Sequence, residues 1–246
     1  DSASRDNPAK DPKLVRPLGF NRDNPYGLQI HKYDNTQPET LEYLSRIRKV
    51  LDKYDAVSVG EIVSENPLDV IGEYSNDQRL HMAYCFEFLS EDFNFSDTNK
   101  IVDQFFHNNP NSWPCWSFSN HDSMRIASRI NKPSKEIMKK LMELKGNICI
   151  YQGEELGLQE TEVKFEDLQD PFGKAFWPEF KGRDGCRTPM PWNPKKINLG
   201  FSENKTWLPV NLDYASKSVE KQKQNSDSML NYTKELIKQR KKGFAT

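Results

Sequence analysis

The chain has 246 residues, with 35 Lys and Arg against 36 Asp and Glu and a formal net charge of −1. This balance argues against a nucleic-acid or anionic-membrane partner, because both bind proteins through an excess of basic side chains. No apolar run approaches the ~20 residues that a bilayer-spanning helix needs, so we expect no membrane segment. An aromatic share of 11% argues against a disordered chain.

The cysteines argue against a metal or disulfide scaffold. All four are far apart, without a Cys-x-x-Cys pair or a paired His spacing. We therefore expect reduced structural thiols and a cytoplasmic location. The chain begins at Asp1 rather than Met, so we expect either that its start has been removed or that it is a piece of a longer protein.

The first part of the chain predicts a long loop, a helix and a buried strand in that order. Residues 1–37 are rich in Pro, Asn and Asp and show no periodicity. Thr36 and Glu39 form a capping box before apolar residues at helical spacing, which predicts a helix ending near Asp55. Ala56–Ile62 follows as a run of strand formers typical of a strand buried on both faces.

The same alternation repeats and predicts an α/β fold with a parallel sheet. Residues 38–152 contain the β/α units, residues 153–219 lose periodicity and form a long excursion, and residues 220–246 hold the last helix. The remaining predicted strands are Leu80–Leu89, Pro114–Ser119 and Asn147–Tyr151; the remaining helices are Lys100–Phe106, one from a cap at Ser134 to a stop at Gly146, and one over about Asp227–Lys242.

Polar residues follow three of the strands directly. They are Gly60-Glu61, Asn120-His121-Asp122 and Gln152-Gly153-Glu154-Glu155. The carboxyl ends of parallel strands meet at one edge of a sheet, where such folds gather their active-site residues. We therefore expect Glu61 and Asp122 to approach each other.

Two carboxyl groups at such an edge suit the cleavage of a glycosidic bond. Glu61 lies between Gly60 and apolar residues, so desolvation is expected to raise its pKa, as a general acid needs. A second carboxylate can then stabilise an oxocarbenium-like transition state, and His121 can hydrogen-bond a sugar hydroxyl. Flat faces for a pyranose are available from Trp113, Trp116, Trp177, Trp192 and Phe176.

Each of these signals also has a purely structural interpretation. Taken alone, a Gly-Glu pair after a strand is more often a loop residue or a helix cap than a catalytic acid, and Asp122 can open a helix. Glu154 and Glu155 suit a solvated or structural pair, and the aromatic residues suit the core.

Four motifs resemble those of the α-amylase superfamily, in its α-glucosidase and oligo-1,6-glucosidase branch. The most specific is Gly182-Arg-Asp-Gly-Cys-Arg-Thr-Pro-Met-Pro-Trp192. The others are Gly60-Glu61, Phe118-Ser-Asn-His-Asp122 and Tyr151-Gln-Gly-Glu-Glu155. Asp23–Gly27 and Tyr33–Glu39 resemble the segment after the nucleophile strand, so the resemblance covers essentially the whole chain in order.

The resemblance implies a role for five residues. Glu61 matches the general acid/base, and Asp122 matches the residue that stabilises the transition state. His121, Arg183 and Arg187 match residues that bind the sugar or support its binding. The implied activity is retaining hydrolysis of α-glucosidic bonds in short oligosaccharides.

The implied fold is a partial (β/α)8 TIM barrel, strands five to eight with their helices, truncated at both ends and forming a single fragment over residues 1–246. The family nucleophile, an Asp in a Gly-x-Arg-x-Asp pattern, has no match in this chain. We therefore expect the isolated chain to be inactive, and marginally stable or self-associating through exposed barrel edges. No metal site or cofactor is implied, and any structural calcium of the family belongs to the missing half.

Two alternatives remain open. One is a transglycosylase or sucrose-acting member of the same family, which shares the catalytic residues. The other is a non-catalytic partner subunit with the same barrel, such as the ectodomain of an amino-acid transporter heavy chain. The sequence does not separate α-1,4 from α-1,6 preference.

Overall fold

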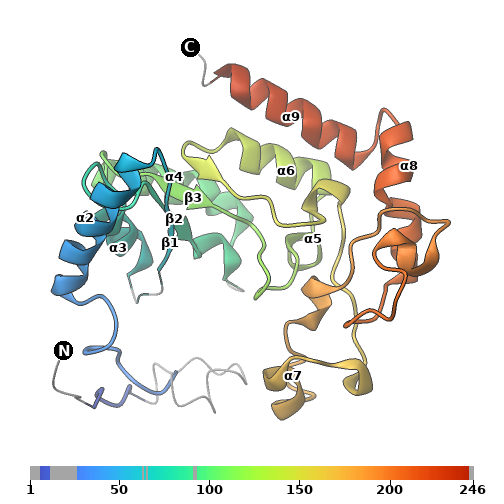
Figure 1. Cartoon of the computed structure of the whole chain (residues 1–246), viewed down its shortest axis with the longest axis horizontal. Coiled ribbons are helices and arrows are strands. Elements are labelled where there is room, and N and C mark those ends of the chain that lie inside the picture. Colours follow the sequence, from blue (N-terminus) through green and yellow to red (C-terminus); the bar gives the residue numbers. More distant parts are fainter. Residues whose placement is uncertain (1–5, 12–26, 63, 65, 91–92, 244–246) are drawn as a thin grey trace.

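The computed structural model describes residues 6–11, 27–62, 64, 66–90 and 93–243. Within them lies a four-stranded parallel sheet in the order β1-β2-β3-β4 (Figure 1). The strands are β1 (Val59–Glu61), β2 (Met82–Cys85), β3 (Pro114–Trp116) and β4 (Asn147–Ile148).

All four predicted strands are present, but each is shorter than its apolar run. After Cys85, for example, the chain leaves the sheet and forms a 3-10 turn over Glu87–Leu89. Phe88 and Leu89 are nevertheless buried. The apolar run therefore reflects burial in the core, of which strand pairing occupies only the first part.

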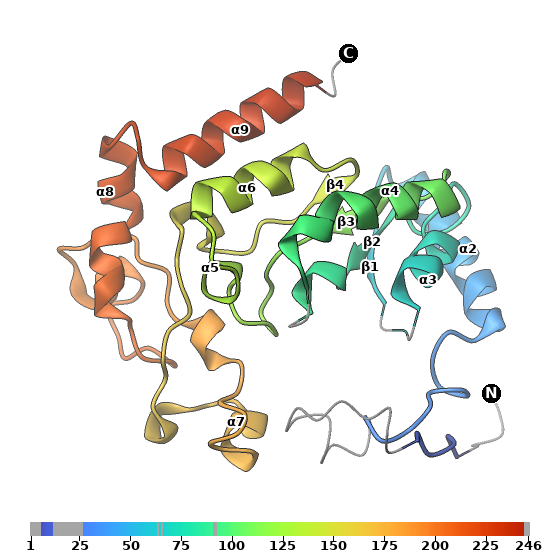
Figure 2. The ribbon, with the colours of Figure 1, turned by 180° about the vertical axis from the view of Figure 1, so that it is seen from behind.

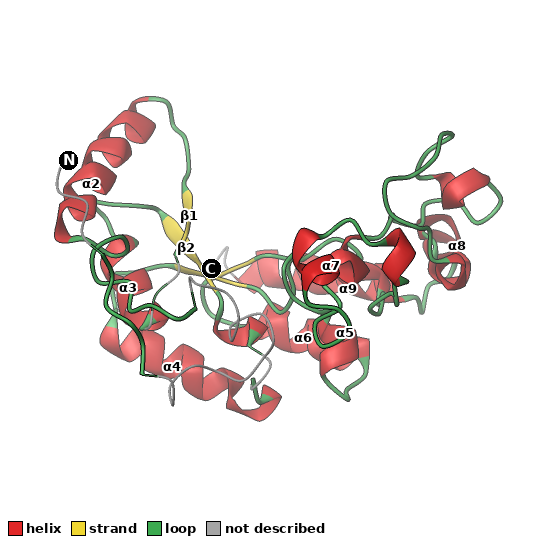
Figure 3. Cartoon of the chain, turned by 90° about the horizontal axis from the view of Figure 1, so that it is seen from below, coloured by secondary structure: helices red, strands yellow, loops and turns green. Residues whose placement is uncertain are grey.

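Helices are present at each predicted place. α6 and α9 lie side by side above the sheet in Figure 2, and Figure 3 shows α4 and α6 on the same side of the strands. Their bounds are α2 (Pro38–Lys53), α4 (Thr98–Asn108), α6 (Ser134–Glu143) and α9 (Met229–Gly243).

Both predicted N-caps are wrong by one residue. Each helix begins next to a proline: Pro38 is the first residue of α2, so the cap is Gln37, and Pro133 is itself the cap of α6. Thr36 instead adopts a left-handed backbone with φ of 52°. Gly146 has φ of 109° as expected of a stop, but it lies beyond Leu144, the C-cap of α6, in the turn into β4.

Four further α-helices within the described residues do not follow from the sequence pattern. The short helices α5 and α7 and the slightly longer α3 and α8 offer too few turns for a clear apolar period. Their bounds are α3 (Pro67–Tyr74), α5 (Ile126–Arg129), α7 (Pro171–Ala175) and α8 (Val219–Gln224). α7 lies in the excursion, which extends on the same side of the sheet as the described part of residues 6–37 (Figure 1).

The hydrophobic core fills the space between the sheet and its helices. Among its fully buried side chains are Phe88, Phe105, Trp116 and Phe118, whose rings contact one another. The expectation that Trp116 offers a face to a sugar is therefore wrong. Its indole is sealed in the core and donates Nε1–H to the carbonyl oxygen of Lys145 at 2.6 Å.

The outer edge of β1 is open. β1 pairs with β2 on one side, and the described residues provide no strand on the other. Val57 and Val59 beside this edge are 67% and 59% exposed, and Tyr54 at the end of α2 is also exposed. Such an edge presents unpaired backbone groups and apolar side chains together.

The structure also bears on the predictions for the cysteines, for membrane and metal-binding segments and for the Asp23–Gly27 motif. The four cysteines are free thiols, as expected, and three of them are buried. In the described ranges no helix is long and apolar enough to cross a membrane, and no group of three or more side chains is arranged to hold a metal ion. Residues 23–26 of the Asp23–Gly27 motif lie outside the described residues.

Candidate active site

Glu61 is the last residue of β1, at the carboxyl end of the sheet. It pairs in register with Tyr84 of β2, so β3 is the second strand away. At about 4.8 Å per strand, the backbones of β1 and β3 are about 10 Å apart. The Glu61 side chain is exposed, so the burial that the sequence predicts for it is not supplied by the described part of this chain.

His121 and Asp122 lie in the loop that follows β3. The Asp122 N–H donates to Oδ1 of the buried Asn120 at 2.9 Å, which fixes a tight turn at this position. His121 Nε2 lies 3.5 Å from Asp122 Oδ2, and both side chains are partly exposed. The two residues therefore face solvent together at the end of the sheet.

Two arginines of the excursion reach the same carboxylate oxygen. Arg183 Nη1 donates to Asp122 Oδ1 at 3.1 Å, and Arg187 Nη2 donates to this atom at 2.7 Å. Arg187 also donates through Nε to the carbonyl oxygen of His121 at 2.7 Å. The structure thus brings four of the five predicted residues into contact.

Glu61 stands apart from this group. Among the described residues, no hydrogen bond or ion pair joins it to Asp122, although both follow strands at the same sheet edge. The contacts of the loop after β3 are instead with the excursion, through Arg183 and Arg187. For Glu61 the structure gives the shared edge and no contact.

Asp170 is a buried carboxylate that the sequence analysis missed. It accepts Nε and Nη2 of Arg183 at 2.9 and 3.0 Å, and the Arg183 backbone N–H at 2.8 Å. Burial acts to raise the pKa of Asp170, but the hydrogen bonds and charge of Arg183 outweigh it and hold that pKa below its usual value. The pair Asp170-Pro171 is typical of a helix cap. Nothing in the sequence indicates that the Asp170 carboxylate pairs with Arg183.

Arg125 is a second missed residue, buried between three segments of the site. It donates through Nη1 to the Gln152 carbonyl at 2.7 Å and through Nη2 to the Cys186 carbonyl at 2.8 Å. Its guanidinium carbon lies 5.2 Å from the centre of the Tyr151 ring. Arg125 therefore ties the loop after β3 to the loop after β4 and to the excursion.

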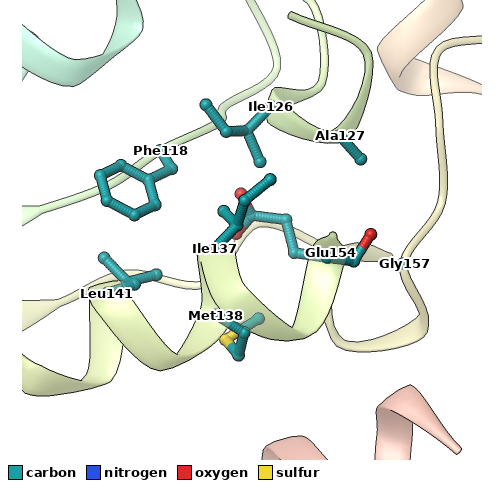
Figure 4. Close-up of a pocket in the computed structure, with 9 residues that line it drawn as sticks. Phe118, Ile126, Ala127, Ile137, Met138, Leu141, Glu154 and Gly157 are labelled. Atoms are coloured by element: carbon teal, nitrogen blue, oxygen red, sulfur yellow. The ribbon is translucent and has the colours of Figure 1, made fainter. Parts of the chain in front are cut away.

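Glu154 is buried, and its side chain lies among apolar residues that include Phe118, Ile137 and Leu141 (Figure 4). Its Oε2 accepts the backbone N–H of Tyr151 at 2.8 Å. Burial raises its pKa to about 7, although the Ser119 hydroxyl and the Tyr151 N–H act to lower it. This matches a structural role for Glu154 and excludes a solvated one.

The arrangement suits a hydroxyl-rich ligand. It combines carboxylate acceptors with fixed guanidinium donors around Asp122, and His121 adds a further polar atom at the surface. Trp192, one of the aromatic residues expected to offer a face to a sugar, is 49% exposed. Parallel α/β folds, barrels among them, gather their active-site residues beyond the carboxyl edge of the sheet in this way.

The chain belongs to the α-amylase family: residues 5–245 match its catalytic domain. A probable α-glucosidase of Rhizobium meliloti (strain 1021) is 41% identical, over 98% of this chain and 46% of its own length. An oligo-1,6-glucosidase of Heyndrickxia coagulans is 28% identical, over 86% of this chain and 45% of its own length.

Solved structures agree. The α-glucosyl transfer enzyme XgtA superimposes with a TM-score of 0.87 at 45% identity, covering 96% of this chain and 45% of its own. An isomaltulose synthase of Klebsiella sp. LX3 has a TM-score of 0.74 at 26% identity, covering 82% and 44%. The chain therefore has the fold of part of a (β/α)8 barrel, and it spans about half the length of the relatives it matches.

Proposed function

We propose that this chain forms one half of the catalytic barrel of a retaining α-glucosidase acting on short α-glucosyl oligosaccharides. The observation that carries the proposal is the carboxylate of Asp122, held by two arginines beside His121 at the sheet edge that also bears Glu61. The names of the relatives, α-glucosidase and oligo-1,6-glucosidase, support it.

In this proposal Glu61 is the general acid/base. It protonates the glycosidic oxygen as the bond to the anomeric carbon breaks, and a carboxylate nucleophile takes that carbon. Glu61, now ionised, then removes a proton from the water whose oxygen attacks the anomeric carbon and releases the sugar. No residue of this chain is assigned as the nucleophile; we place it in the part of the relatives that the chain does not span.

The other site residues bind and stabilise. Asp122 stabilises positive charge that develops on the sugar ring, and its carboxylate also accepts a hydrogen bond from a sugar hydroxyl. His121 donates a hydrogen bond to a sugar hydroxyl. Arg183 and Arg187 hold Asp122 in place and present donors to the sugar. No cofactor is needed for this chemistry, and the proposal includes neither a nucleic acid nor a membrane as partner.

The test is glucose release by the protein encoded by the full reading frame. Maltose, isomaltose and a p-nitrophenyl α-glucoside are assayed with the wild type and with Glu61→Gln. We expect activity on at least one substrate and a loss of at least about 10²-fold in the variant. A folded wild type that is inactive on all three would shift the assignment to a non-catalytic partner subunit.

A second candidate is transfer of the α-glucosyl unit to a sugar instead of water. The observation in its favour is the similarity to XgtA, an α-glucosyl transfer enzyme that is 45% identical in sequence. The two reactions share the glucosyl–enzyme intermediate and differ in the acceptor. Product analysis with maltose separates them, since transfer to a second maltose releases one glucose for each trisaccharide formed, whereas hydrolysis releases two glucose molecules per maltose and forms no trisaccharide.

We further propose a cytoplasmic location and self-association of the isolated chain. The free thiols favour a reducing compartment. The open β1 edge, with Val57 and Val59 exposed, favours pairing with a second copy.

A further inference from the structure

Arg183 is held by one carboxylate and directed at another. Its Nε and Nη2 donate to Oδ2 and Oδ1 of Asp170, which leaves Nη1 for Oδ1 of Asp122. A guanidinium group is planar, so fixing two of its nitrogens fixes the direction of the third. Its carbon also lies 5.4 Å from the centre of the Phe172 ring, which limits rotation out of this plane.

Asp170 is itself rigidly placed. Its side chain is fully buried, and Oδ1 also accepts the N–H of Phe172 at 3.2 Å, which caps α7. On the other side, Asp184 Oδ2 accepts the backbone N–H groups of Gln169 and Asp170 at 2.6 and 2.8 Å. The orientation of the Asp170 carboxylate is therefore set by the backbone around it.

Two glycines allow the approach of the two segments. A Cβ on Gly173 of α7 would lie 2.8 Å from the Cα of Gly182, and a Cβ on Gly182 would lie the same distance from the Cα of Gly173. Backbone contact at this distance excludes any side chain at either position. It brings the start of α7 directly against the residue before Arg183.

We propose that Asp170 is a positioning residue for the sugar site: it holds Arg183 so that Nη1 reaches Asp122, and thereby fixes the Asp122 carboxylate for the sugar. Asp170 touches no substrate and acts through Arg183. The inference rests on the proposed glycosidase function, because it assigns Asp122 to sugar binding.

A double-mutant cycle on kcat/KM tests this in the full-length protein. Asp170→Asn keeps the shape but removes the charge and one acceptor oxygen. We expect it to lower kcat/KM by about 10- to 100-fold in the wild type, and by less than about 3-fold in the Arg183→Lys background. Asp167→Asn, an exposed carboxylate of the same excursion, is the matched control and leaves kcat/KM unchanged.

Equal losses in both backgrounds would overturn the proposal, as would an unchanged kcat/KM for Asp170→Asn. A wild type without activity on any α-glucoside refutes the glycosidase function, and this inference with it. An active wild type with additive losses refutes the positioning role alone.

A spectroscopic measurement tests the same contact with Asp170 in place, so it does not depend on whether an Asp170 variant folds. In protein labelled with 15N-arginine, the Arg183 Nε–H signal is assigned by its loss in Arg183→Lys. Because Asp170 holds this N–H, we expect it to exchange with water at least about 10-fold more slowly than Nε–H of Arg46, which is exposed. Equal exchange rates would show that Asp170 does not hold Arg183 and would overturn the proposal.

Discussion

Arg187 binds both the side chain of Asp122 and the backbone of the preceding residue, His121. Nη2 donates to Asp122 Oδ1 and Nε donates to the carbonyl oxygen of His121, both at 2.7 Å. A residue 65 positions away in sequence therefore sets both the carboxylate and the loop that carries it.

Arg187→Lys is expected to lower kcat/KM of the full-length enzyme by about 10- to 100-fold, because an ammonium cannot make both hydrogen bonds in this geometry. Steady-state kinetics on the best α-glucoside measures the effect. Arg46→Lys, on the exposed face of α2, serves as the control. Full activity of Arg187→Lys would show that Asp122 is held by other groups.

Glu154 makes stability depend on pH. Its pKa is raised from 4.5 to about 7 in the folded state, so the folded protein binds the proton more tightly than the unfolded chain. Folding stability from this group is fully present below about pH 4.5 and is lost as pH rises to about 7.

Glu154→Gln removes this dependence. Relative to the wild type, we expect the variant to gain up to about 3 kcal/mol between pH 4.5 and 7, measured by urea unfolding at several pH values. Glu203→Gln, at an exposed position, should run parallel to the wild type. A Glu154→Gln curve parallel to the wild type as well would contradict the buried, proton-binding carboxyl.

Arg125→Met is expected to destabilise the fold by about 2–4 kcal/mol, because the carbonyl groups of Gln152 and Cys186 lose their donors. Thermal or urea unfolding measures the change. Arg46→Met should cost less than about 1 kcal/mol. Equal effects of the two substitutions would mean that Arg125 does not tie the loops together.

Gly173→Ala tests the contact between α7 and the segment before Arg183. The new methyl group must displace the backbone of Gly182, so we expect a loss of about 1–3 kcal/mol in stability together with reduced activity. The matched control is Gly243→Ala, where a Cβ meets nothing within 4 Å. A stable, fully active Gly173→Ala protein would contradict the close backbone approach.

The open edge of β1 predicts that residues 1–246, produced alone, self-associate. Light scattering after size-exclusion chromatography should show dimers or larger species that Val59→Lys disperses, since a lysine on an edge strand opposes pairing. Leu212→Lys, in the excursion at a position that is 72% exposed, should leave the association unchanged. Monomeric wild type would argue against pairing at this edge.

Much of this fold can be predicted from the sequence, because buried helices and strands require apolar residues at a regular spacing. Leu41 and Leu44 repeat at helical spacing and mark α2, and the apolar run that contains Cys85 marks β2. The predicted first residues of helices are wrong where a single proline decides them, as Pro38 does for α2 and Pro133 does for α6. Strand pairing ends before the burial does, so the strands were predicted too long.

The site could be predicted where a motif carries it and not where tertiary contacts create it. His121, Asp122, Arg183 and Arg187 stand in motifs and do meet. Asp170 and Arg125 are single charged residues without a local pattern, and their roles depend on partners 13 and 61 positions away. Burial of Glu154 likewise depends on α6, which packs over it.

The alternation of acidic and basic groups around Asp122 also bears on the choice of ligand. Asp122 and Asp170 contribute two negative charges, and Arg183 and Arg187 contribute two positive ones, so these four side chains sum to zero. A phosphorylated sugar would find no surplus cation among them to neutralise its phosphate. Under the proposed function, an uncharged glucosyl unit would meet directed donors and acceptors without a net field, so that hydrogen-bond geometry would select it.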